Sequence, residues 1–150
     1  MDDRAAIERL IYEYTYRLDG ADLDPWGELF ADADWAIAAG FESDQGILLH
    51  GAKPVADWGR ANLKVHEDGT LRTKHVTTNV TIDITPDGER ASALMYLTVF
   101  QAVPPHFPLQ AVFSGRYEDE FVKDAGEWRY ERRLIHADAV GDLSEHNTQV

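Results

Sequence analysis

The second half of the chain is a succession of β-patterned segments joined by short turns, and no other feature limits the fold as strongly. Residues 72–85 (RTKHVTTNVTIDIT) are rich in β-branched residues and end at the turn sequence Pro86-Asp87-Gly88. Three similar segments follow at residues 89–102, 109–122 and 127–140. Because consecutive strands joined by short turns pair side by side, the sequence predicts an antiparallel meander.

The residues before this meander have helical spacing. Apolar side chains recur every three or four positions between residues 2 and 18: Ile7, Leu10, Ile11, Tyr14 and Leu18. Shorter helices are predicted at residues 24–30 and 53–65, and short strands at residues 34–39 and 46–50. Helices first and a sheet afterwards predict an α+β fold whose helices cover one face of the sheet.

One folding unit accounts for the whole chain. Its 150 residues fit a single domain with one core, and no repeat or flexible linker divides residues 1–150. No apolar run is long enough to cross a membrane. The acidic N-terminal residues MDDRAAIERL lack the basic and apolar regions of a secretory signal. We therefore expect a cytoplasmic protein that has no membrane partner.

The charge of the chain argues against one large class of function. Against 14 Lys and Arg residues the chain carries 27 Asp and Glu residues, a formal net charge of −13. A surface this acidic repels phosphate backbones and anionic membranes, so nucleic acid is not an expected partner. Cysteine is absent from the sequence, which excludes disulfides, thiolate nucleophiles and cysteine metal sites.

No motif in the sequence points to a metal or an organic cofactor. The histidines His50, His66 and His75 have no regular ligand spacing, and Asp32 with Asp34 is typical of a solvated turn before a strand. G-x-G-x-x-G, P-loop and G-x-S-x-G strings are missing, so nucleotide binding and the common serine-hydrolase elbow are unsupported. We expect a protein that works without a metal or cofactor.

Four strings spread over the chain resemble one known family: RAAIERLIYEYTYRLDGAD, WGELFADADW, LRTKHVTTNVTID and GRYEDEFVKDAGEWRYERR. They are similar to the SnoaL-like, nuclear-transport-factor-two-like group, which includes polyketide cyclases, scytalone dehydratase, a lindane dehydrochlorinase and a bile-acid dehydratase. The resemblance implies a curved antiparallel sheet wrapped around the N-terminal helices, forming a cone with a deep pocket. It implies little about the substrate, because one fold hosts many chemistries.

The same resemblance implies an active-site pair. In the dehydratase and dehydrochlorinase branches, an Asp at the end of the first helix pairs with a His on a later strand, and Asp19 and His75 match these positions. Tyr14 matches a Tyr that lies five residues before the Asp in the bile-acid dehydratase. Scytalone dehydratase has a Tyr directly before its Asp, where this chain has Leu18, and its second catalytic His has no clear counterpart here. These departures argue against scytalone dehydratase itself.

An Asp–His pair suits proton abstraction. A neutral imidazole takes a proton from carbon or oxygen near neutral pH, and a carboxylate on its other ring nitrogen fixes the tautomer and stabilises the imidazolium. A phenol, from Tyr14 or Tyr117, would donate a hydrogen bond to the substrate oxygen that gains charge. The set fits deprotonation next to a carbonyl, followed by elimination, isomerisation or aldol ring closure.

The strand pattern leaves the position of His75 open. Strict alternation along residues 72–85 places four apolar residues on one face: Val76, Val80, Ile82 and Ile84. His75 then lies on the opposite, polar face, which either lines a cavity or is solvated, and a bulge would change the register. Asp19 lies about 100° from the centre of the apolar helix face, where it would serve either the site or only the helix end. Tyr14 lies near the middle of that face, as a core residue would.

Aromatic residues supply a wall for either a core or a substrate pocket, namely Trp35, Trp58 and Phe113. Under strict alternation Arg132 and His136 share one strand face with Trp128, where they would reach the pocket unless Arg132 pairs with acidic groups. Residues 102–109 (AVPPHFPL) are predicted to form a loop over the pocket mouth, with an exposed His106. The polar tail from Gly141 is either loose or closes the pocket.

The leading hypothesis is a lyase, isomerase or cyclase acting on a small hydrophobic carbonyl or hydroxyl compound, with a dehydratase favoured. His75 is the expected general base, Asp19 its orienting partner, and Tyr14 and Tyr117 the expected oxyanion donors. Two alternatives stay open: a non-catalytic binding module on the same fold, and an accessory subunit like the small β subunits of ring-hydroxylating dioxygenases. The resemblance also implies a homo-oligomer, either a dimer or a trimer.

Overall fold

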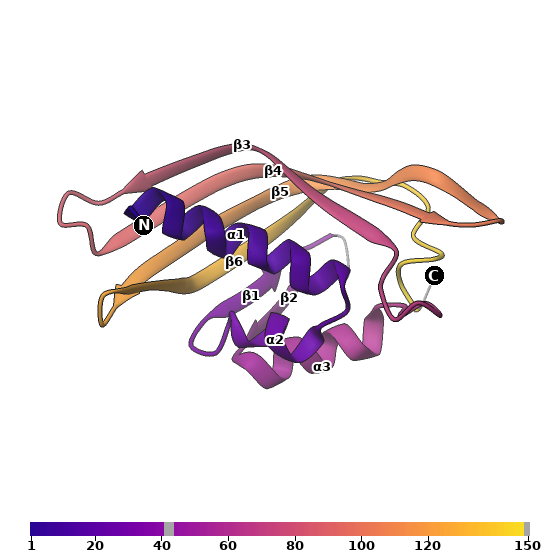
Figure 1. The fold of residues 1–150 in the computed structure, drawn as a ribbon, viewed down its shortest axis with the longest axis horizontal. Helices are drawn as coiled ribbons and strands as arrows, with labels where there is room; N and C mark the ends of the chain where they lie inside the picture. Colours follow the sequence, from indigo (N-terminus) through magenta and orange to yellow (C-terminus); the bar gives the residue numbers. More distant parts are fainter. Residues whose placement is uncertain (41–43, 149–150) are drawn as a thin grey trace.

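Three helices and six strands form the described part of the chain, which comprises residues 1–40 and 44–148 of a computed structural model. The helices are α1 (Asp3–Asp19), α2 (Leu23–Glu28) and α3 (Ala52–Asn62). The strands are β1 (Asp34–Ile37), β2 (Ile47–His50), β3 (Thr73–Ile84), β4 (Arg90–Val103), β5 (Phe107–Asp124) and β6 (Glu127–Val140). Helices come first and the long strands afterwards, which confirms the α+β class (Figure 1).

The six strands form one sheet in the order β2-β1-β6-β5-β4-β3. The four long strands, β3 to β6, pair antiparallel with one another in sequence order, as the meander predicts. β1 was not expected beside β6, and it pairs with β6 in parallel, with Asp34 opposite Arg132 and Ile37 opposite Ile135. The sheet stays open, because β2 and β3 lie at its opposite edges.

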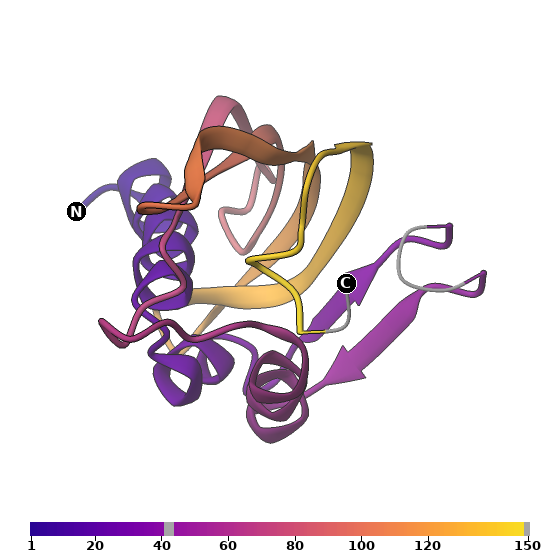
Figure 2. The same cartoon turned by 90° about the vertical axis from the view of Figure 1, so that its right-hand side faces the viewer.

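The sheet curves around the helices, and α1 lies across its concave side (Figures 1 and 2). The Asp2 carboxylate accepts a hydrogen bond from the backbone N–H of Ala5 at 2.8 Å, which caps the start of α1. The apolar stripe of α1 is buried in the same core as residues of the long strands, with Ile7 and Ile11 fully shielded from solvent. Burial of this stripe therefore fixes which side of α1 faces the sheet.

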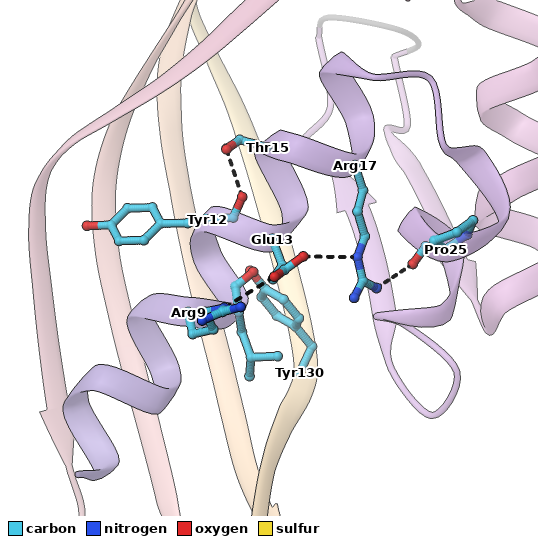
Figure 3. A network of polar contacts seen from close by, with 8 residues as sticks. Arg9, Tyr12, Glu13, Thr15, Arg17, Pro25 and Tyr130 are labelled. Carbon is cyan, nitrogen blue, oxygen red and sulfur yellow. Dashed lines mark hydrogen bonds and ion pairs between the residues drawn. The ribbon is translucent and has the colours of Figure 1, made fainter. Parts of the chain in front are cut away.

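Charged residues on the outer side of α1 hold the next helix in place (Figure 3). The Glu13 carboxylate accepts hydrogen bonds from Nε of Arg9 at 3.2 Å and from Nε of Arg17 at 3.3 Å. Arg17 also donates from Nη1 to the backbone carbonyl of Pro25, at 2.7 Å. The end of α1 is thereby tied to α2.

α2 and α3 pack closely because glycines lie at their contact. A Cβ atom on Gly27 would lie 2.5 Å from the carbonyl oxygen of Ala52, and one on Gly59 would lie 2.9 Å from the Trp26 ring. α3 ends at Asn62, before the predicted end at residue 65. The reason is that Leu63 adopts an extended conformation and pairs as a β-bridge with Asn147.

A β-bulge in β3 corrects the strict alternation expected for this strand. The pairing of β3 with β4 shifts register between Thr78 and Thr81, and Asn79 has a left-handed φ of 57°. Before the bulge the odd-numbered residues, His75 among them, are the less exposed ones, whereas after it Val80 and Ile82 are. Val76 therefore points away from the core and is 40% exposed.

A second register shift corrects the face expected for β6. Phe121 pairs with Tyr130 but Glu120 pairs with Arg132, so Glu131 is the extra residue between them. Trp128 and Tyr130 are buried before this point, and Arg133 and Ile135 are buried after it. Arg132, which we expected to share a face with Trp128, is consequently exposed.

The connection between β4 and β5 is tighter than predicted. Val103 pairs with Phe107, so only residues 104–106 form the turn, with a cis peptide bond between Pro104 and Pro105. The predicted loop at residues 102–109 is thus mostly strand. Its His106 is exposed, as expected, and its Nε2 lies 3.0 Å from the Glu145 carboxylate in the C-terminal tail.

The described residues after β6 fold back onto the body of the protein instead of hanging loose. The backbone N–H of Lys64 donates to the carbonyl of His146, and that of Thr148 donates to the carbonyl of Asn62, both at 2.9 Å. Leu143 is buried in the core. The tail therefore packs against the end of α3 and closes the wide end of the concave side.

Candidate active site

Asp19 and His75 meet at the junction between α1 and β3. Asp19 is the last residue of α1, and its backbone carbonyl accepts a hydrogen bond from the N–H of Leu71 at 3.1 Å. This bond brings the start of β3 against the end of the helix. The Nδ1 atom of His75 lies 2.5 Å from Oδ1 of Asp19. Two residues that the family resemblance singled out are therefore in direct contact.

The Asp19 carboxylate accepts three hydrogen bonds from β3. Besides the imidazole, the backbone N–H of His75 donates to Oδ2 at 3.0 Å, and the Thr73 hydroxyl donates to Oδ1 at 2.7 Å. Only 14% of the Asp19 side chain and 6% of the His75 side chain are exposed. Because the Nδ1–H of His75 is committed to the carboxylate, Nε2 is the nitrogen left to accept a proton.

The surroundings keep Asp19 ionised. Burial raises the pKa of its carboxyl, but the hydrogen bonds from His75 and Thr73 and the charge of the imidazolium outweigh burial, so the pKa lies below its ordinary value. An ionised Asp19 is the form that holds His75 in one tautomer and stabilises its protonated state. The pair thus has the electrostatics of a general base with its orienting carboxylate.

His75 lines a mostly apolar cavity of about 70 Å³. All three aromatic residues expected at a pocket, Trp35, Trp58 and Phe113, lie in its wall. The two tyrosines considered as oxyanion donors, Tyr14 and Tyr117, lie there too. Asp19 stands behind His75, outside this wall, where it borders a groove on the other side of the junction.

Tyr14 and Tyr117 stay neutral in this position. Burial raises the pKa of Tyr14 and raises that of Tyr117 well above the ordinary value. Their ring centroids are 5.7 Å apart in an edge-on arrangement, and Nε1 of Trp35 donates to the Tyr14 hydroxyl at 3.0 Å. A neutral phenol keeps its O–H, so it can donate a hydrogen bond to a substrate oxygen.

A buried ion pair supports the two tyrosines from behind. Arg133 donates from Nε and Nη2 to the two carboxylate oxygens of Asp119, at 2.8 and 2.7 Å, and both side chains are fully buried. The guanidinium carbon lies 3.7 Å from the ring centroid of Tyr117 and 4.1 Å from that of Tyr14. Strict alternation places Arg132 on the inner face of β6. The bulge at Glu131 shifts this pattern by one residue, so Arg133 faces inward instead.

His146 in the C-terminal tail also lines the cavity, a position that no sequence pattern predicts. Its ring centroid is 6.0 Å from that of His75. Burial and, after it, the charge of His75 lower the pKa of His146 to about 3. Its Nδ1 atom has no hydrogen-bond partner among the described residues. A tail without apolar periodicity offers no pattern from which such an inward position could be predicted.

The other two sequence-predicted residues lie outside the cavity. Arg132 is exposed, because of the bulge described above. His136 lies on the outer side of β6, where its Nε2 is 3.3 Å from Oε2 of Glu118. It borders a surface depression with Arg116 and Asp138 instead of the cavity. The expectation that they reach the pocket is therefore wrong for both.

Within residues 1–40 and 44–148, no three His, Asp or Glu side chains come together in a way that could hold a metal ion. In the same part of the chain, none of the helices has the length and apolar character needed to cross a membrane.

Residues 1–134 match the family model of the SnoaL-like domain. No curated protein sequence matches the chain.

Several solved structures share the fold. An NTF2-like protein with a cystatin-like fold from Novosphingobium aromaticivorans has 21% identity and a TM-score of 0.74, covering 95% of this chain and 86% of that one. A candidate scytalone dehydratase from the same organism has 20% identity and a TM-score of 0.69, covering 93% and 87%. ActVI-ORFA from Streptomyces coelicolor has 17% identity and a TM-score of 0.71, covering 90% and 97%. Identities this low establish a common fold and leave the activity open.

Replacing Asp19 by Asn is expected to weaken the fold more at neutral pH than in acid. Because the folded-state pKa of Asp19 is depressed, its contribution is present above the unfolded-state pKa and is lost as pH falls through the folded-state pKa. We expect Asp19→Asn to lower the free energy of unfolding by about 1–3 kcal/mol at pH 7 and by less at pH 3, measured by urea titration. Asp32→Asn, at an exposed position, is the control. Equal losses at both pH values would contradict an ionic role for Asp19.

Removing one partner of the buried Arg133–Asp119 pair is expected to lower the free energy of unfolding more than replacing both partners by apolar residues. Asp119→Ala leaves an unpaired buried guanidinium, so we expect a loss of about 3–5 kcal/mol in the free energy of unfolding. The double variant Arg133→Met/Asp119→Leu should recover most of this loss. The control is Asp138→Ala, which breaks the half-exposed Arg116–Asp138 pair and should have a much smaller effect. A single variant as stable as the wild type would show that the pair is dispensable.

Proposed function

The chain belongs to the SnoaL-like domain family, and we propose that it is a cofactor-independent lyase, isomerase or cyclase, with dehydration favoured. The observation that supports this most is the contact between Asp19 and His75, 2.5 Å long, at the wall of an apolar cavity. A His that is held by a carboxylate and faces an apolar space is suited to remove a proton from a bound organic molecule.

In the proposed reaction, His75 removes a proton from the carbon next to a carbonyl group. The C–H electron pair forms the enolate, and Asp19 stabilises the imidazolium that results. When a hydroxyl group is on the neighbouring carbon, the enolate electrons form a C=C bond as the C–O bond breaks. The departing oxygen takes the proton back from His75 and leaves as water. Without such a hydroxyl, return of the proton to another carbon gives isomerisation. Attack of the enolate carbon on a second carbonyl closes a ring, and the alkoxide that forms takes the proton back from His75.

Tyr14 and Tyr117 are the proposed donors to the oxygen that gains charge in the enolate. Both hydroxyl groups are kept protonated by burial, and both side chains lie in the cavity wall with His75. Their positions are fixed by Arg133 behind the rings and by Trp35 beside Tyr14. Donors that are already oriented before the reaction stabilise a developing oxyanion without reorganisation.

A small hydrophobic carbonyl or hydroxyl compound is the proposed substrate. Trp35, Trp58 and Phe113 give the cavity aromatic walls, and few polar groups line it. An apolar space of about 70 Å³ favours a small molecule with one or two oxygen atoms over a charged or extended one.

A second copy of the chain is the proposed partner, and it would cover the outer face of the sheet. Large apolar side chains are exposed there on β3, β4 and β5: Val76, Leu94, Tyr96, Phe100 and Leu109. Exposed apolar side chains on one sheet face are suited to a contact between copies, and a two-fold contact buries the same face on both copies. The alternative, an accessory subunit without activity, would bury this face against a different polypeptide.

The base assignment can be tested by proton exchange at carbon with cyclopentanone, a small ketone, as the probe. We expect the wild type to speed up exchange of the α-protons in D2O, followed by NMR, and His75→Gln to lower this rate by about 10²–10⁴-fold. The matched control is His50→Gln, which breaks an exposed His–Asp contact of 2.7 Å with Asp34 and should leave the rate unchanged. Equal rates for the wild type and His75→Gln would refute the assignment.

The oligomer proposal can be tested by light scattering after size exclusion. We expect the wild type to have a multiple of the monomer mass, and Tyr96→Glu on the outer sheet face to reduce it, because charge opposes burial of the patch. Tyr16→Glu, on the exposed side of α1, is the control and should keep the wild-type mass. A monomeric wild type would count against the homo-oligomer and in favour of a different partner chain.

A further inference from the structure

We propose that His146, in the segment after β6, contacts the substrate and donates a hydrogen bond from its neutral imidazole to the substrate hydroxyl that departs as water. This inference deepens the proposed function and rests on it, since it adds a second histidine to the same cavity. It assigns to the enzyme a substrate whose hydroxyl group lies on the carbon next to the one that His75 deprotonates.

The backbone around His146 is fixed by hydrogen bonds from three sides. The N–H of Lys64 donates to the carbonyl of His146 at 2.9 Å. The preceding carbonyl, that of Glu145, accepts from Nε2 of the buried Gln101 at 2.9 Å and lies 2.8 Å from Nε2 of His66. Gln101 also donates to the carbonyl of Leu71 at 3.0 Å, just before β3. The tail is therefore joined to the strand that carries His75, and the two imidazoles are placed by one hydrogen-bonded network.

The His146 ring has a polar atom that the protein leaves unused. The residue is 9% exposed, its ring lines the cavity, and its Nδ1 has no hydrogen-bond partner among the residues that the structure describes. The described residues supply no hydrogen-bond partner for its Nε2 either, and a mostly buried imidazole whose N–H has no acceptor is an exception that calls for an explanation such as a functional role. In the tautomer with the proton on Nε2, the shielded Nδ1 carries only a lone pair, and the Nε2–H is the group left for a ligand in the cavity.

His75 and His146 differ in whether a carboxylate contacts the imidazole ring, and this difference separates their proposed roles. His75 has the Asp19 carboxylate on its Nδ1, whereas the described residues place no carboxylate on His146. Burial and then the charge of His75 disfavour a proton on His146 and lower its pKa; the opposing influence of Asp19 is smaller than either, and that of His66 is smaller still. His146 is therefore neutral whenever His75 holds the substrate proton. A neutral imidazole donates a hydrogen bond without giving its proton away.

The distance between the rings suits one substrate arrangement. With centroids 6.0 Å apart, the two imidazoles can flank a C–C–O unit that offers its C–H to His75 and its oxygen to His146. In the elimination step the C–H and C–O bonds break, the C=C bond forms, and the proton held by His75 goes to the departing oxygen. The N–H of His146 stabilises the negative charge on that oxygen until the proton arrives.

The test compares two single-ring probes of equal shape, phenol and toluene, which differ by a hydroxyl for a methyl group. We expect the wild type to bind phenol more tightly, and His146→Phe to reduce that preference by about two- to tenfold while binding of toluene is kept. His146→Gln, which retains an N–H donor, should keep part of the preference. His106→Phe, at an exposed histidine beside the same tail, is the matched control. Tryptophan fluorescence reports binding, since Trp35 and Trp58 line the cavity.

Nitrogen NMR of the wild type supplies a readout that needs no variant. We expect the His146 ring to be a neutral Nε2–H tautomer at pH 6, and its ring signals to shift on addition of phenol but not of toluene. A preference for phenol that survives His146→Phe, or His146 ring signals that do not respond to phenol, would overturn the inference. If the preference is lost but His75→Gln leaves cyclopentanone exchange unchanged, His146 would remain a ligand contact and the proposed reaction would be refuted.

Discussion

The three hydrogen bonds that the Asp19 carboxylate accepts are the interaction on which the site depends. They come from the hydroxyl of Thr73 and from the backbone and ring of His75, so a single side chain joins the end of α1 to β3 and orients the imidazole. Taking a carboxylate out of water opposes its ionisation, and these donors reverse that effect. The contacts that join α1 to β3 are thus also the contacts that orient the imidazole.

A second buried charged group, the guanidinium of Arg133, lies behind the wall of the cavity and supports it. The guanidinium of Arg133 is neutralised by Asp119 and lies against the faces of Tyr14 and Tyr117. An uncompensated cation there would be costly, and a purely apolar layer would hold the phenols less specifically. The apolar surface that a ligand meets is therefore supported by an ionic layer beneath it, and the aromatic rings owe their orientation to that layer.

Most of the fold could be predicted because its signals are local: apolar spacing marks α1, and turn sequences separate the long strands. Resemblance supplied Asp19 and His75, which spacing alone left ambiguous. Three features could not be predicted from the sequence, each for a physical reason. The parallel pairing of β1 with β6 joins residues far apart in sequence. The bulge at Glu131 places Arg133, and not Arg132, on the inner face of the sheet. His146 owes its position to hydrogen bonds from β4 and from the segment between α3 and β3, and these produce no periodic pattern in the sequence of the tail.

The bulge at Asn79 has a consequence for how this chain can vary over evolution. His75 faces inward together with Val80 and Ile82 only because one additional residue separates the two halves of β3. The orientation of the imidazole is therefore encoded in the number of residues between Thr78 and Thr81 more than in their identity. Substitutions within this stretch leave that count intact, whereas loss of one residue turns either the imidazole or the apolar half of the strand toward water. Descendants of this sequence can be diverse there in composition while remaining constant in length.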